Sequence, residues 1–426
     1  MLSPNRIAVQ NMAKQAAHKW AFKAGMRAGS YNWKSSARAI ARIKSTVLEI
    51  KAVNRADPVA AAEGVIALAE RIWPAFEHID TSSGALGSAV NGTHEALIPI
   101  LIAASADEAT RAKWLGRLRH AIKDDGVDYL FPFSEHFGKI AKFPKLMNEH
   151  ADLDLDMIRH AWSDWAQFSY VTTATLTLSC LLEAERYDDL TEVLALQKSR
   201  SWFDERFAAQ ALLRQGRDDE ALAFAQVMLD AGHQSYNYAE ICKFCEDILV
   251  RQGKEDDAYR RFGLPTATGN TYLSMWRSLF KRYPDRDPRG ILEDLMGLYD
   301  AKGKWFATAK TAGFLDIALD CAADTAVEPA TLIRAARDFT TKDSTFAAKV
   351  ALQAIAHLLA GRGYEAIPSD LDAAASHLLA ATTKLDQVGW AIQALRRLEV
   401  TALPHTDGLM MLRLRATIVA FENAAV

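Results

Sequence analysis

The sequence lacks the features that mark membrane-spanning, fibrous and disordered proteins. Its longest apolar run, Ala96–Ala104, is far too short to cross a bilayer and contains a proline. Twelve prolines and 22 glycines among 426 residues are too few for a fibrous or disordered chain. The N-terminus is positively charged but has no continuous apolar segment of the kind found in secretory signals. These absences predict a soluble protein of the cytoplasm.

Cysteine is also scarce. Four cysteines, at positions 180, 242, 245 and 321, are typical of reduced thiols in a cytosolic protein rather than of a disulfide framework. Cys242 and Cys245 form a single CxxC, and a zinc site would need two further ligands. His233 lies nearby, but no second Cys or His pair has the expected spacing. Cysteines buried between packed helices are the better interpretation, and the sequence indicates neither a metal nor a cofactor.

Acidic residues are almost missing from the first 55 positions. This region has eleven Lys or Arg and one acid, Glu49, so its net charge is +10, whereas the whole chain has −3. The remaining residues therefore carry −13. Such a basic region can bind nucleic acid, an anionic membrane or an acidic partner, or it can dock on the acidic body of the same molecule.

What the sequence does contain is helical periodicity. Apolar side chains recur every three or four residues between positions 37 and 54, as one stripe of Ile40, Ile43, Val47 and Ile50. Another face of the same segment carries a basic stripe of Lys44, Lys51 and Arg55. Asp57 and Pro58 then provide an N-cap and a first helical residue. No segment alternates with a period of two, so we predict an all-α protein.

The second half contains an internal repeat. The segment LLRQGRDDEALAFAQ (212–226) is similar to LVRQGKEDDAYRRFG (249–263), with an offset of 37 residues. Gly216 and Gly253 would end one helix in a left-handed conformation, acidic residues would begin the next, and Ala221 and Ala258 would allow close packing. Degenerate copies are found at 181–196 and 298–319. A period near that of tetratricopeptide repeats (TPRs) predicts an α-solenoid of antiparallel helix hairpins, TPR-like in the second half.

Three parts follow from these patterns. We expect a basic helical N-terminal region over 1–56, a helical region over 57–180 and TPR-like helical repeats over 181–426. The full TPR pattern of Trp, Leu-Gly and Tyr is missing. Turn-forming segments at 262–270, 282–290 and 326–330 are short, and we interpret them as corners between helices rather than as domain linkers.

Several short motifs resemble an uncharacterised family of bacterial helical-repeat proteins, a domain of unknown function. They are Trp33 before a basic helix, ADPVAA (56–61), DTSSG (80–84), LLRQGRDDEAL (212–222) and LFKRYPDRD (279–287). The resemblance runs through most of the chain. It implies a helical fold and a bacterial source, and it implies no activity.

The most glycine-rich stretch is DTSSGALGSAVNGTHE (80–95). Its glycine spacing is that of a phosphate-binding loop, but Thr93 stands where that loop needs lysine. The loop also needs a preceding strand, and 66–79 has a helical pattern. We instead expect Asp80 to Ser83 to supply N-cap oxygens and Gly84 and Gly87 to allow close helix packing. A weaker alternative is an anion held at a helix N-terminus by Ser82, Ser83 and Gly84.

The sequence contains no recognisable catalytic constellation. Glu135 and His136 lie in an aromatic segment, DYLFPFSEHFGKIAKFP (128–144), where an acid–base pair in a cleft is conceivable. A hydrophobic helix hairpin with proline corners explains that composition better. If the protein were an enzyme, we would expect convergent polar groups in a deep pocket around these two residues.

The basic N-terminal region is the strongest candidate site. Its cations are interleaved with four aromatic residues, Trp20, Phe22, Tyr31 and Trp33. Cations at helical spacing neutralise phosphates and exposed rings stack on bases, whereas an ordinary solvated helix face also fits. The candidate polyanion-binding residues are Lys14, Lys19, Lys23, Arg27, Lys34, Arg38, Arg42 and Lys44.

Taken together, the sequence favours a non-enzymatic scaffold that binds a protein or peptide partner in a concave groove. The alternative is a nucleic-acid-binding helical-repeat protein that uses the basic N-terminal region. A role in DNA repair is one form of this alternative. That alternative predicts one continuous basic surface that includes residues 14–44 and the cations of RAKWLGRLRH (111–120).

Overall fold

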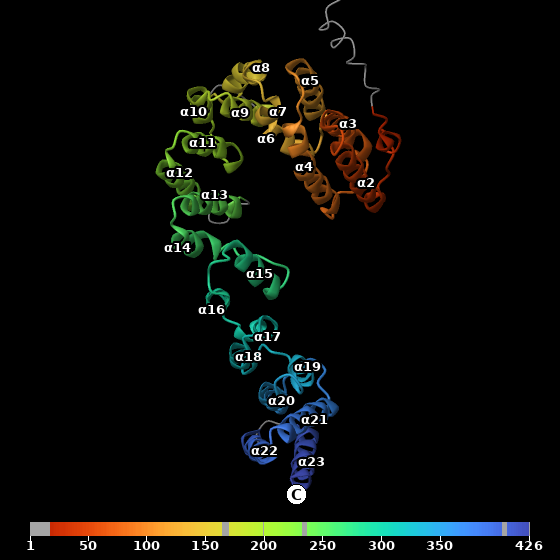
Figure 1. Ribbon diagram of the computed structural model, residues 1–426, viewed down its shortest axis with the longest axis vertical. Helices are drawn as coiled ribbons and strands as arrows, with labels where there is room; N and C mark the ends of the chain where they lie inside the picture. The colour runs from red at the N-terminus through yellow and green to blue at the C-terminus, as the bar shows by residue number, and fades with distance from the viewer. Residues whose placement is uncertain (1–17, 164–169, 199, 232–236, 403–406, 426) are drawn as a thin grey trace, which may run out of the picture. The chain divides into compact units, whose positions relative to one another are not determined.

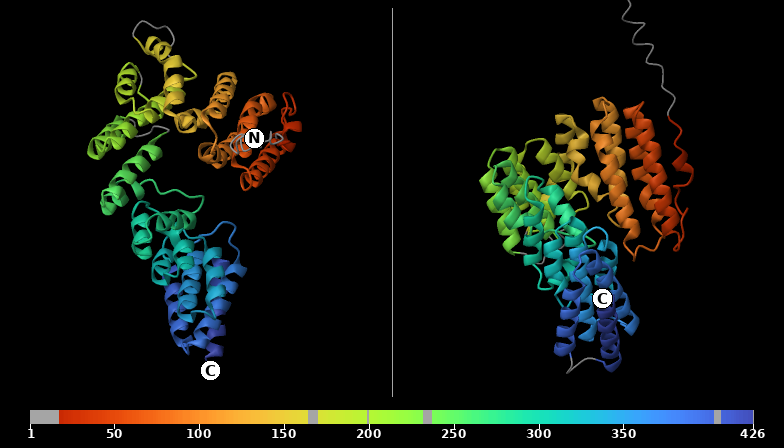
Figure 2. Two further views of the ribbon diagram at one scale, coloured as in Figure 1. Left: turned by 45° about the horizontal axis from the view of Figure 1, so that its top comes forward. Right: turned by 60° about the horizontal axis from the view of Figure 1, so that its bottom comes forward.

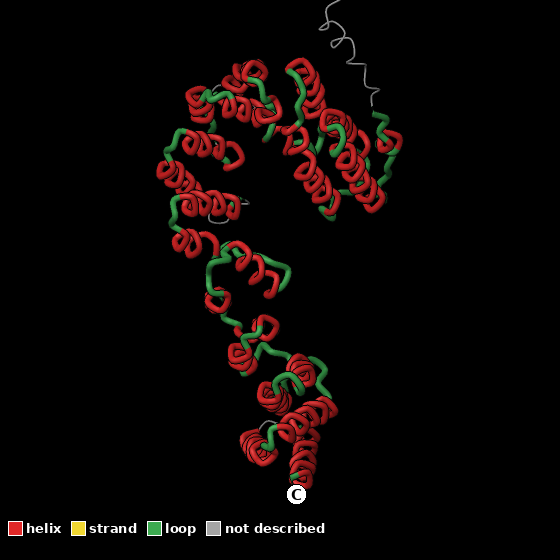
Figure 3. The backbone as a smooth tube through the Cα atoms, in the orientation of Figure 1, coloured by secondary structure: helices red, strands yellow, loops and turns green. Residues whose placement is uncertain are grey.

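The computed structural model of this chain describes residues 18–425, apart from 164–169, 199, 232–236 and 403–406. The regular structure of these residues is entirely helical (Figure 3), as the sequence predicts. Packing divides the chain into two compact units, residues 1–241 and 242–426. The division falls inside helix α13 (Tyr238–Arg251). The predicted three-part division stays a prediction.

The first unit begins with a short 3₁₀ turn, Ala21–Ala24, and continues with helices (Figure 1). They are α2 (Ser36–Asn54), α3 (Pro58–Phe76), α4 (Ala85–Ala103), α5 (Glu108–Asp124), α6 (Phe131–Glu135), α7 (Phe137–Ala141), α8 (Pro144–Trp162), α9 (Ala174–Glu183), α10 (Tyr187–Ala195), α11 (Trp202–Arg214) and α12 (Asp218–Ala231).

The second unit consists of shorter helices followed by longer ones. They are α14 (Glu255–Ala258) with a π turn (Tyr259–Gly263), α15 (Tyr272–Arg282), α16 (Pro288–Gly297), a 3₁₀ turn (Lys302–Trp305), α17 (Phe306–Ala312), α18 (Leu315–Ala322), α19 (Pro329–Phe339), α20 (Ser344–Leu359), α21 (Pro368–Lys384), α22 (Val388–Ala402) and α23 (Gly408–Ala424).

Within each unit, helices pack on their neighbours in sequence. In the first unit α2 contacts α3 and α4, and α3 contacts α5. In the second, α20 contacts α19, α21 and α22, and Figure 2 shows this last group of helices, in blue, lying side by side. Consecutive helix pairs that stack on the pairs before and after them define an α-solenoid.

The predicted corners are confirmed in detail. Gly216 and Gly253 both have φ of 72°, in the left-handed region. In each corner, the residue after the glycine donates its backbone N–H to the carbonyl five residues before it. Arg217 N–H donates to the Leu212 carbonyl at 3.0 Å and Lys254 N–H to the Leu249 carbonyl at 2.8 Å. The repeat found in the sequence is therefore a repeated helix ending.

The degenerate copies form the same corner with different residues. In 181–196 the left-handed position is Glu185, with φ of 58°, and Arg186 N–H donates to the Leu181 carbonyl at 2.9 Å. In 298–319 it is Gly313, with φ of 89°. A further corner, at Asp386 with φ of 55°, was not predicted. Whether residues 181–426 are TPR-like in a stricter sense stays a prediction.

The Asp57–Pro58 boundary and the stripes of α2 are also as predicted. The Asp57 carboxylate accepts the Ala60 N–H at 2.9 Å, and Pro58 is the first residue of α3. On α2, Ile43 and Ile50 are buried while Lys44, Lys51 and Arg55 are exposed. The basic stripe therefore faces solvent.

Residues 18–35 depart from the prediction. Lys19, Lys23 and Arg27 repeat every four residues, yet this segment forms a 3₁₀ turn and irregular loops instead of an α-helix. Its conformation is set by tertiary contacts, which outweigh local periodicity. The Glu49 carboxylate accepts the N–H groups of Ala21 and Phe22, at 2.6 and 3.2 Å.

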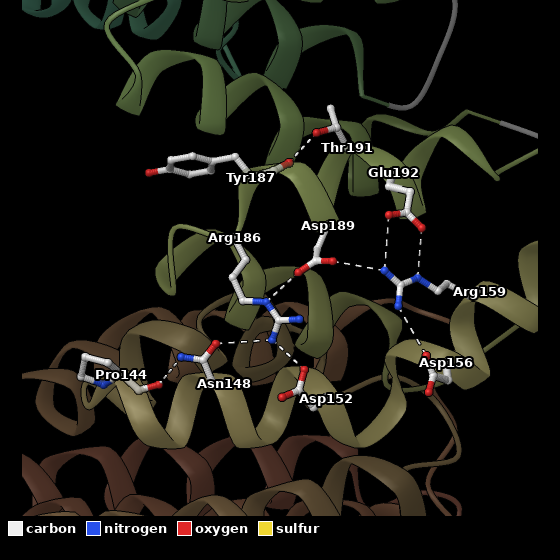
Figure 4. A network of polar contacts seen from close by, with 10 residues as sticks. All are labelled: Pro144, Asn148, Asp152, Asp156, Arg159, Arg186, Tyr187, Asp189, Thr191 and Glu192. Atoms are coloured by element: carbon white, nitrogen blue, oxygen red, sulfur yellow. Dashed lines mark hydrogen bonds and ion pairs between the residues drawn. The ribbon is translucent and has the colours of Figure 1, made fainter.

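Charged side chains also connect neighbouring hairpins of the first unit (Figure 4). Arg186 Nε lies 2.8 Å from Asp189 Oδ2, and Arg186 Nη1 lies 2.6 Å from Asp152 Oδ1. The other oxygen of Asp189 lies 3.1 Å from Arg159 Nη2. Asp189 on α10 is thereby held to α8, the helix that ends at the cavity described below.

Candidate functional site

The first unit contains a cavity of about 1470 Å³ that is the strongest candidate site. Its walls come from α4, α6, α7, the end of α8, the start of α9 and the start of α11. Aromatic and proline side chains line it together with polar groups. The apolar part includes Pro99, Phe131, Pro132, Trp162, Tyr170 and Phe203, and the polar part includes Asn91, Glu95, Asp128, Glu135, His136, Lys139, Gln197, Lys198 and Asp204.

Two phenylalanines on separate helices meet at this cavity. The rings of Phe131 on α6 and Phe203 on α11 pack edge to face, with centroids 5.8 Å apart. Both side chains are only partly buried. An aromatic pair with remaining exposed surface in a concave site is the kind of anchor that binding partners use.

Glu135 and His136, which the sequence singled out, both line the cavity. Ser179 on α9 fixes their backbone, because its hydroxyl donates to the Glu135 carbonyl at 2.9 Å and accepts the Gly138 N–H at 3.1 Å. The Glu135 carboxylate forms an ion pair with Arg206, which also lies 3.4 Å from Glu240. The carboxylate is therefore engaged by a guanidinium, which does not suit a general base.

The electrostatics of the cavity favour the neutral form of the His136 imidazole. Burial lowers the pKa of His136, and the charges of Lys139 and Arg206 act in the same direction against the opposing charge of Glu183. Burial raises the pKa of the Asp204 carboxyl, while the amide of Gln197 donates to it at 2.8 Å. The site thus offers a neutral imidazole and a half-buried acid, both set among aromatic rings.

The predicted polyanion-binding residues fall into separate groups. Lys14 lies outside the described residues. Lys19, Lys23 and Arg27 line an open depression of about 990 Å³ against α3. Arg38 donates to the Ser30 carbonyl at 3.3 Å and lies over the Tyr31 ring.

The other predicted cations lie around the start of α2 and along it. Lys34 is exposed before α2, and Lys44 is exposed on it. The Arg42 guanidinium packs against Gly25. The structure therefore brings three of the eight predicted cations into one depression.

The aromatic residues of this region are mostly unavailable for stacking on bases. Trp20, Phe22 and Tyr31 are buried, at 4, 1 and 4% exposure, and only Trp33 is exposed, at 65%. Three of the four rings serve the core instead. This finding removes the stacking part of the nucleic-acid interpretation for those three rings.

Three of the four cations of residues 111–119 are also used inside the fold, whereas Lys113 is exposed. Arg111 is buried among backbone carbonyls, Arg117 binds Glu70 and Glu63, and Arg119 forms an ion pair with Asp154. They do not extend a basic surface. The continuous surface expected for a nucleic-acid binder is not formed by these three side chains.

The segment 80–84 leads into α4, but the N-cap residue is Gly84 and no side chain caps this helix, so the N-cap oxygens expected from Asp80 to Ser83 are wrong. Asp80 Oδ1 accepts the Ser82 N–H at 2.9 Å, and Ser83 Oγ accepts the Ala85 N–H at 3.4 Å. The backbone hydrogen bond from Ser82 holds the pKa of Asp80 below its usual value. Gly84 has φ of 68°. An anion held by Ser82, Ser83 and Gly84 stays a prediction.

The packing role expected of two glycines there is wrong. A Cβ built at Gly84 or Gly87 meets no atom within 4 Å, so neither position allows a close approach of helices. Gly84 instead supplies a left-handed conformation before α4, which a side chain would disfavour.

All four cysteines are buried and free of disulfides. Burial raises the pKa of Cys245 to about 12. In the described part of the chain, no three His, Cys, Asp or Glu side chains are arranged to hold a metal ion. His233 lies outside that part. No helix among the described residues is long and apolar enough to span a membrane.

The fold defines this chain as a helical-repeat scaffold. No protein-family model matches the chain, and no curated protein matches it. One solved structure with some similarity is described as a circular tandem repeat protein with novel repeat topology and enhanced subunit contact surfaces. It is 13% identical over 91% of this chain and 88% of that chain, with a TM-score of 0.14. The α-solenoid assignment therefore depends on the helix packing of this chain, and a bacterial source stays a prediction.

Proposed function

We propose that this protein is a non-enzymatic scaffold and that its first unit binds a peptide segment of a protein partner in the cavity between α4, α6, α9 and α11. The observation that carries the proposal is the cavity itself. At about 1470 Å³ it exceeds the ~300–1,000 Å³ of most small-molecule sites. Stacked helix hairpins commonly present such concave surfaces to partners.

The lining of the cavity supports a peptide ligand. Phe131 and Phe203 offer apolar surface on two different helices, which a partner side chain can contact at once. Exposed charges of both signs, Glu95, Asp128 and Lys139, lie in the same lining, where they can orient a peptide backbone or side chains. The engaged Glu135 argues for binding rather than acid–base chemistry.

The experiment is a selection from a displayed peptide library against the full-length protein. Peptides chosen on the wild type are then measured by fluorescence anisotropy against a Phe131→Ala/Phe203→Ala double variant. We expect binding to weaken ~10-fold or more, because truncation of anchor residues typically costs more than about 1 kcal/mol each.

The matched control is Phe339→Ala, which removes a half-buried phenylalanine from α19 in the second unit. It should leave peptide affinity within about twofold, since Phe339 does not line the cavity and belongs to the other unit. Circular dichroism checks that both variants keep their helix content. Failure to select any binder, or equal binding by the double variant, contradicts the proposal.

A further inference from the structure

The open depression beside α3 is a second site, built around cations that the fold brings together. Its lining includes Lys19, Lys23, Arg27 and Arg71, together with His18. The first three come from the irregular N-terminal segment, whereas Arg71 comes from the next-to-last turn of α3. Arg71 was not selected from the sequence, because its approach to the lysines depends on tertiary packing.

The backbone that carries these cations is held by buried groups. Trp20 is 4% exposed and lies against Gly64, where a Cβ would come within 2.3 Å of the Trp20 ring. Phe22 and Met26 are also buried, at 1 and 0% exposure. Because these three side chains are anchored in the core, the backbone is fixed, with Lys19 and Arg27 exposed and Lys23 half-buried.

Among the residues that the structure describes, Arg71 is the one cation of these four that lies within ion-pair distance of an acid, 3.7 Å from Glu70. The side chains of Lys19, Lys23 and Arg27 form no ion pair within the described residues. Arg71 donates to the Ala67 carbonyl at 2.9 Å and is 32% exposed. Like charges gathered in one depression repel one another, so an anion that occupied it would stabilise the fold.

The one acid that lines the depression, Glu70, shares the guanidinium of Arg117 with Glu63. Glu70 receives two hydrogen bonds from Arg117, Nε to Oε1 at 2.7 Å and Nη2 to Oε2 at 2.8 Å. The Arg117 hydrogen bonds hold the pKa of Glu70 below its usual value, with smaller contributions from Arg71 and Lys23. The four cations of the depression, Arg117 and the two carboxylates that Arg117 contacts therefore carry a net charge of +3.

We infer that this depression binds a compact phosphorylated ligand with two or more phosphoryl groups. A single phosphate carries a charge of about −1.5 to −2 at neutral pH, which is less than the net charge of +3 of this group. Arg27 and Arg71 provide forked donors and the lysines provide point charges, as phosphate sites do. The inference is independent of the peptide cavity, since the two sites share no residue.

A compact ligand fits better than a nucleic-acid strand. The Trp20 ring lines the depression but its face is used against Gly64, so it is not free to stack on a base. The exposed stripe of Lys44, Lys51 and Arg55 lies on α2 and at its C-cap, and none of these three side chains lines the depression. Recognition in the depression would therefore depend on phosphoryl groups alone.

The test is isothermal titration calorimetry of the full-length protein with inorganic tripolyphosphate at low salt. We expect one saturable site per chain in the wild type. The affinity should fall ~10-fold or more in a Lys23→Gln/Arg27→Gln variant and in Arg71→Gln, because charge-assisted contacts are lost. Thermal unfolding checks that the variants remain folded.

The matched control is Lys44→Gln/Lys51→Gln, which removes the same charge from the exposed stripe of α2. It should keep the affinity within about twofold. Absence of saturable binding, or equal weakening by both double variants, would overturn the inference. A single-stranded DNA oligonucleotide that binds more tightly than tripolyphosphate and weakens in both double variants would overturn it in favour of nucleic acid.

Discussion

Arg111 is a fully buried guanidinium with backbone carbonyls as its partners. It donates to Ile140 O at 2.5 Å, to Ile102 O at 3.1 Å, to Leu101 O at 3.4 Å and to Ala104 O. Three of these carbonyls lie at the C-terminal end of α4, where helices leave acceptors without intrahelical donors. The Arg111 side chain on α5 therefore supplies the hydrogen-bond donors that the last carbonyls of α4 lack.

Removing this guanidinium should destabilise the first unit strongly. We expect Arg111→Met to lower the free energy of unfolding by roughly 3 kcal/mol or more, because several buried carbonyls lose their donors. Chemical denaturation measures the change. Lys113→Met, two residues away and exposed, should stay within about 0.5 kcal/mol. Similar losses in both variants would contradict the assigned role.

Two buried histidines should make the first unit sensitive to acid. Burial lowers the pKa of His94 to about 4, and burial with the nearby Arg119 lowers that of His150 to about 4. In the unfolded chain both pKa values return to about 6.5, so between pH 6.5 and 4 the unfolded state binds protons that the folded state does not. Stability is therefore full above pH 6.5 and falls as the pH is lowered toward 4.

The expected loss between pH 7 and pH 5 is about 2 kcal/mol for each histidine. Denaturation at the two pH values should show a smaller difference in His94→Leu, which removes a titrating group at 1% exposure. His78→Leu, an exposed position, should leave the difference unchanged. A wild-type stability that is flat from pH 7 to pH 5 would contradict the assignment.

At the scale of helices and corners, the repeated helix ending gives a direct prediction. Glu185 and Asp386 hold the left-handed position that Gly216 and Gly253 hold elsewhere. A side chain there costs roughly 1 kcal/mol relative to glycine. Glu185→Gly should therefore raise the free energy of unfolding by up to about 1 kcal/mol, measured by chemical denaturation.

The converse substitution serves as the control. Gly216→Ala should lower stability by about 1 kcal/mol, because alanine disfavours a φ of 72°. Gly116→Ala, inside α5 with no atom near its Cβ position, should instead raise stability by about 0.5–1 kcal/mol. If Gly216→Ala were also stabilising, the left-handed corner would be wrong.

Corners were predictable from the sequence where a copy of the repeat is recognisable, as at Gly216, Gly253 and, in a degenerate copy, Glu185. Gly216 and Gly253 were found because glycine is the common residue at such helix ends. Asp386 was missed because an acid in this position is indistinguishable in sequence from a first-turn acid. Residues 18–35 were missed for a related reason, since cations spaced by four suit a helix and an anchored loop alike.

At the scale of the whole chain, each unit has a hydrophobic core of its own. One core includes Leu115 and the other includes Leu378, both fully buried. We expect calorimetry to show two unfolding transitions. Leu115→Ala should destabilise the first unit and Leu378→Ala the second, each by roughly 2–5 kcal/mol of unfolding free energy, so each variant should shift one transition to lower temperature. A single transition shifted equally by both would contradict separate cores.

Some of the residues that line the cavity could be identified from the sequence, and others could not. Glu135 and His136 were singled out from one aromatic segment, and both line the cavity. Phe203 and Asp204 were not, because their neighbours in space lie some 70 residues earlier in the chain. No local pattern connects α6 to α11. The fold class follows from periodicity, whereas the site requires the tertiary arrangement.

The contact between Trp20 and Gly64 has a consequence for sequences related to this one. An indole occupies the space that any side chain at position 64 would need. A relative that keeps tryptophan at the first position should keep glycine at the second. One that replaces the tryptophan by a small residue should be free to carry alanine or serine there, so the two positions should change together.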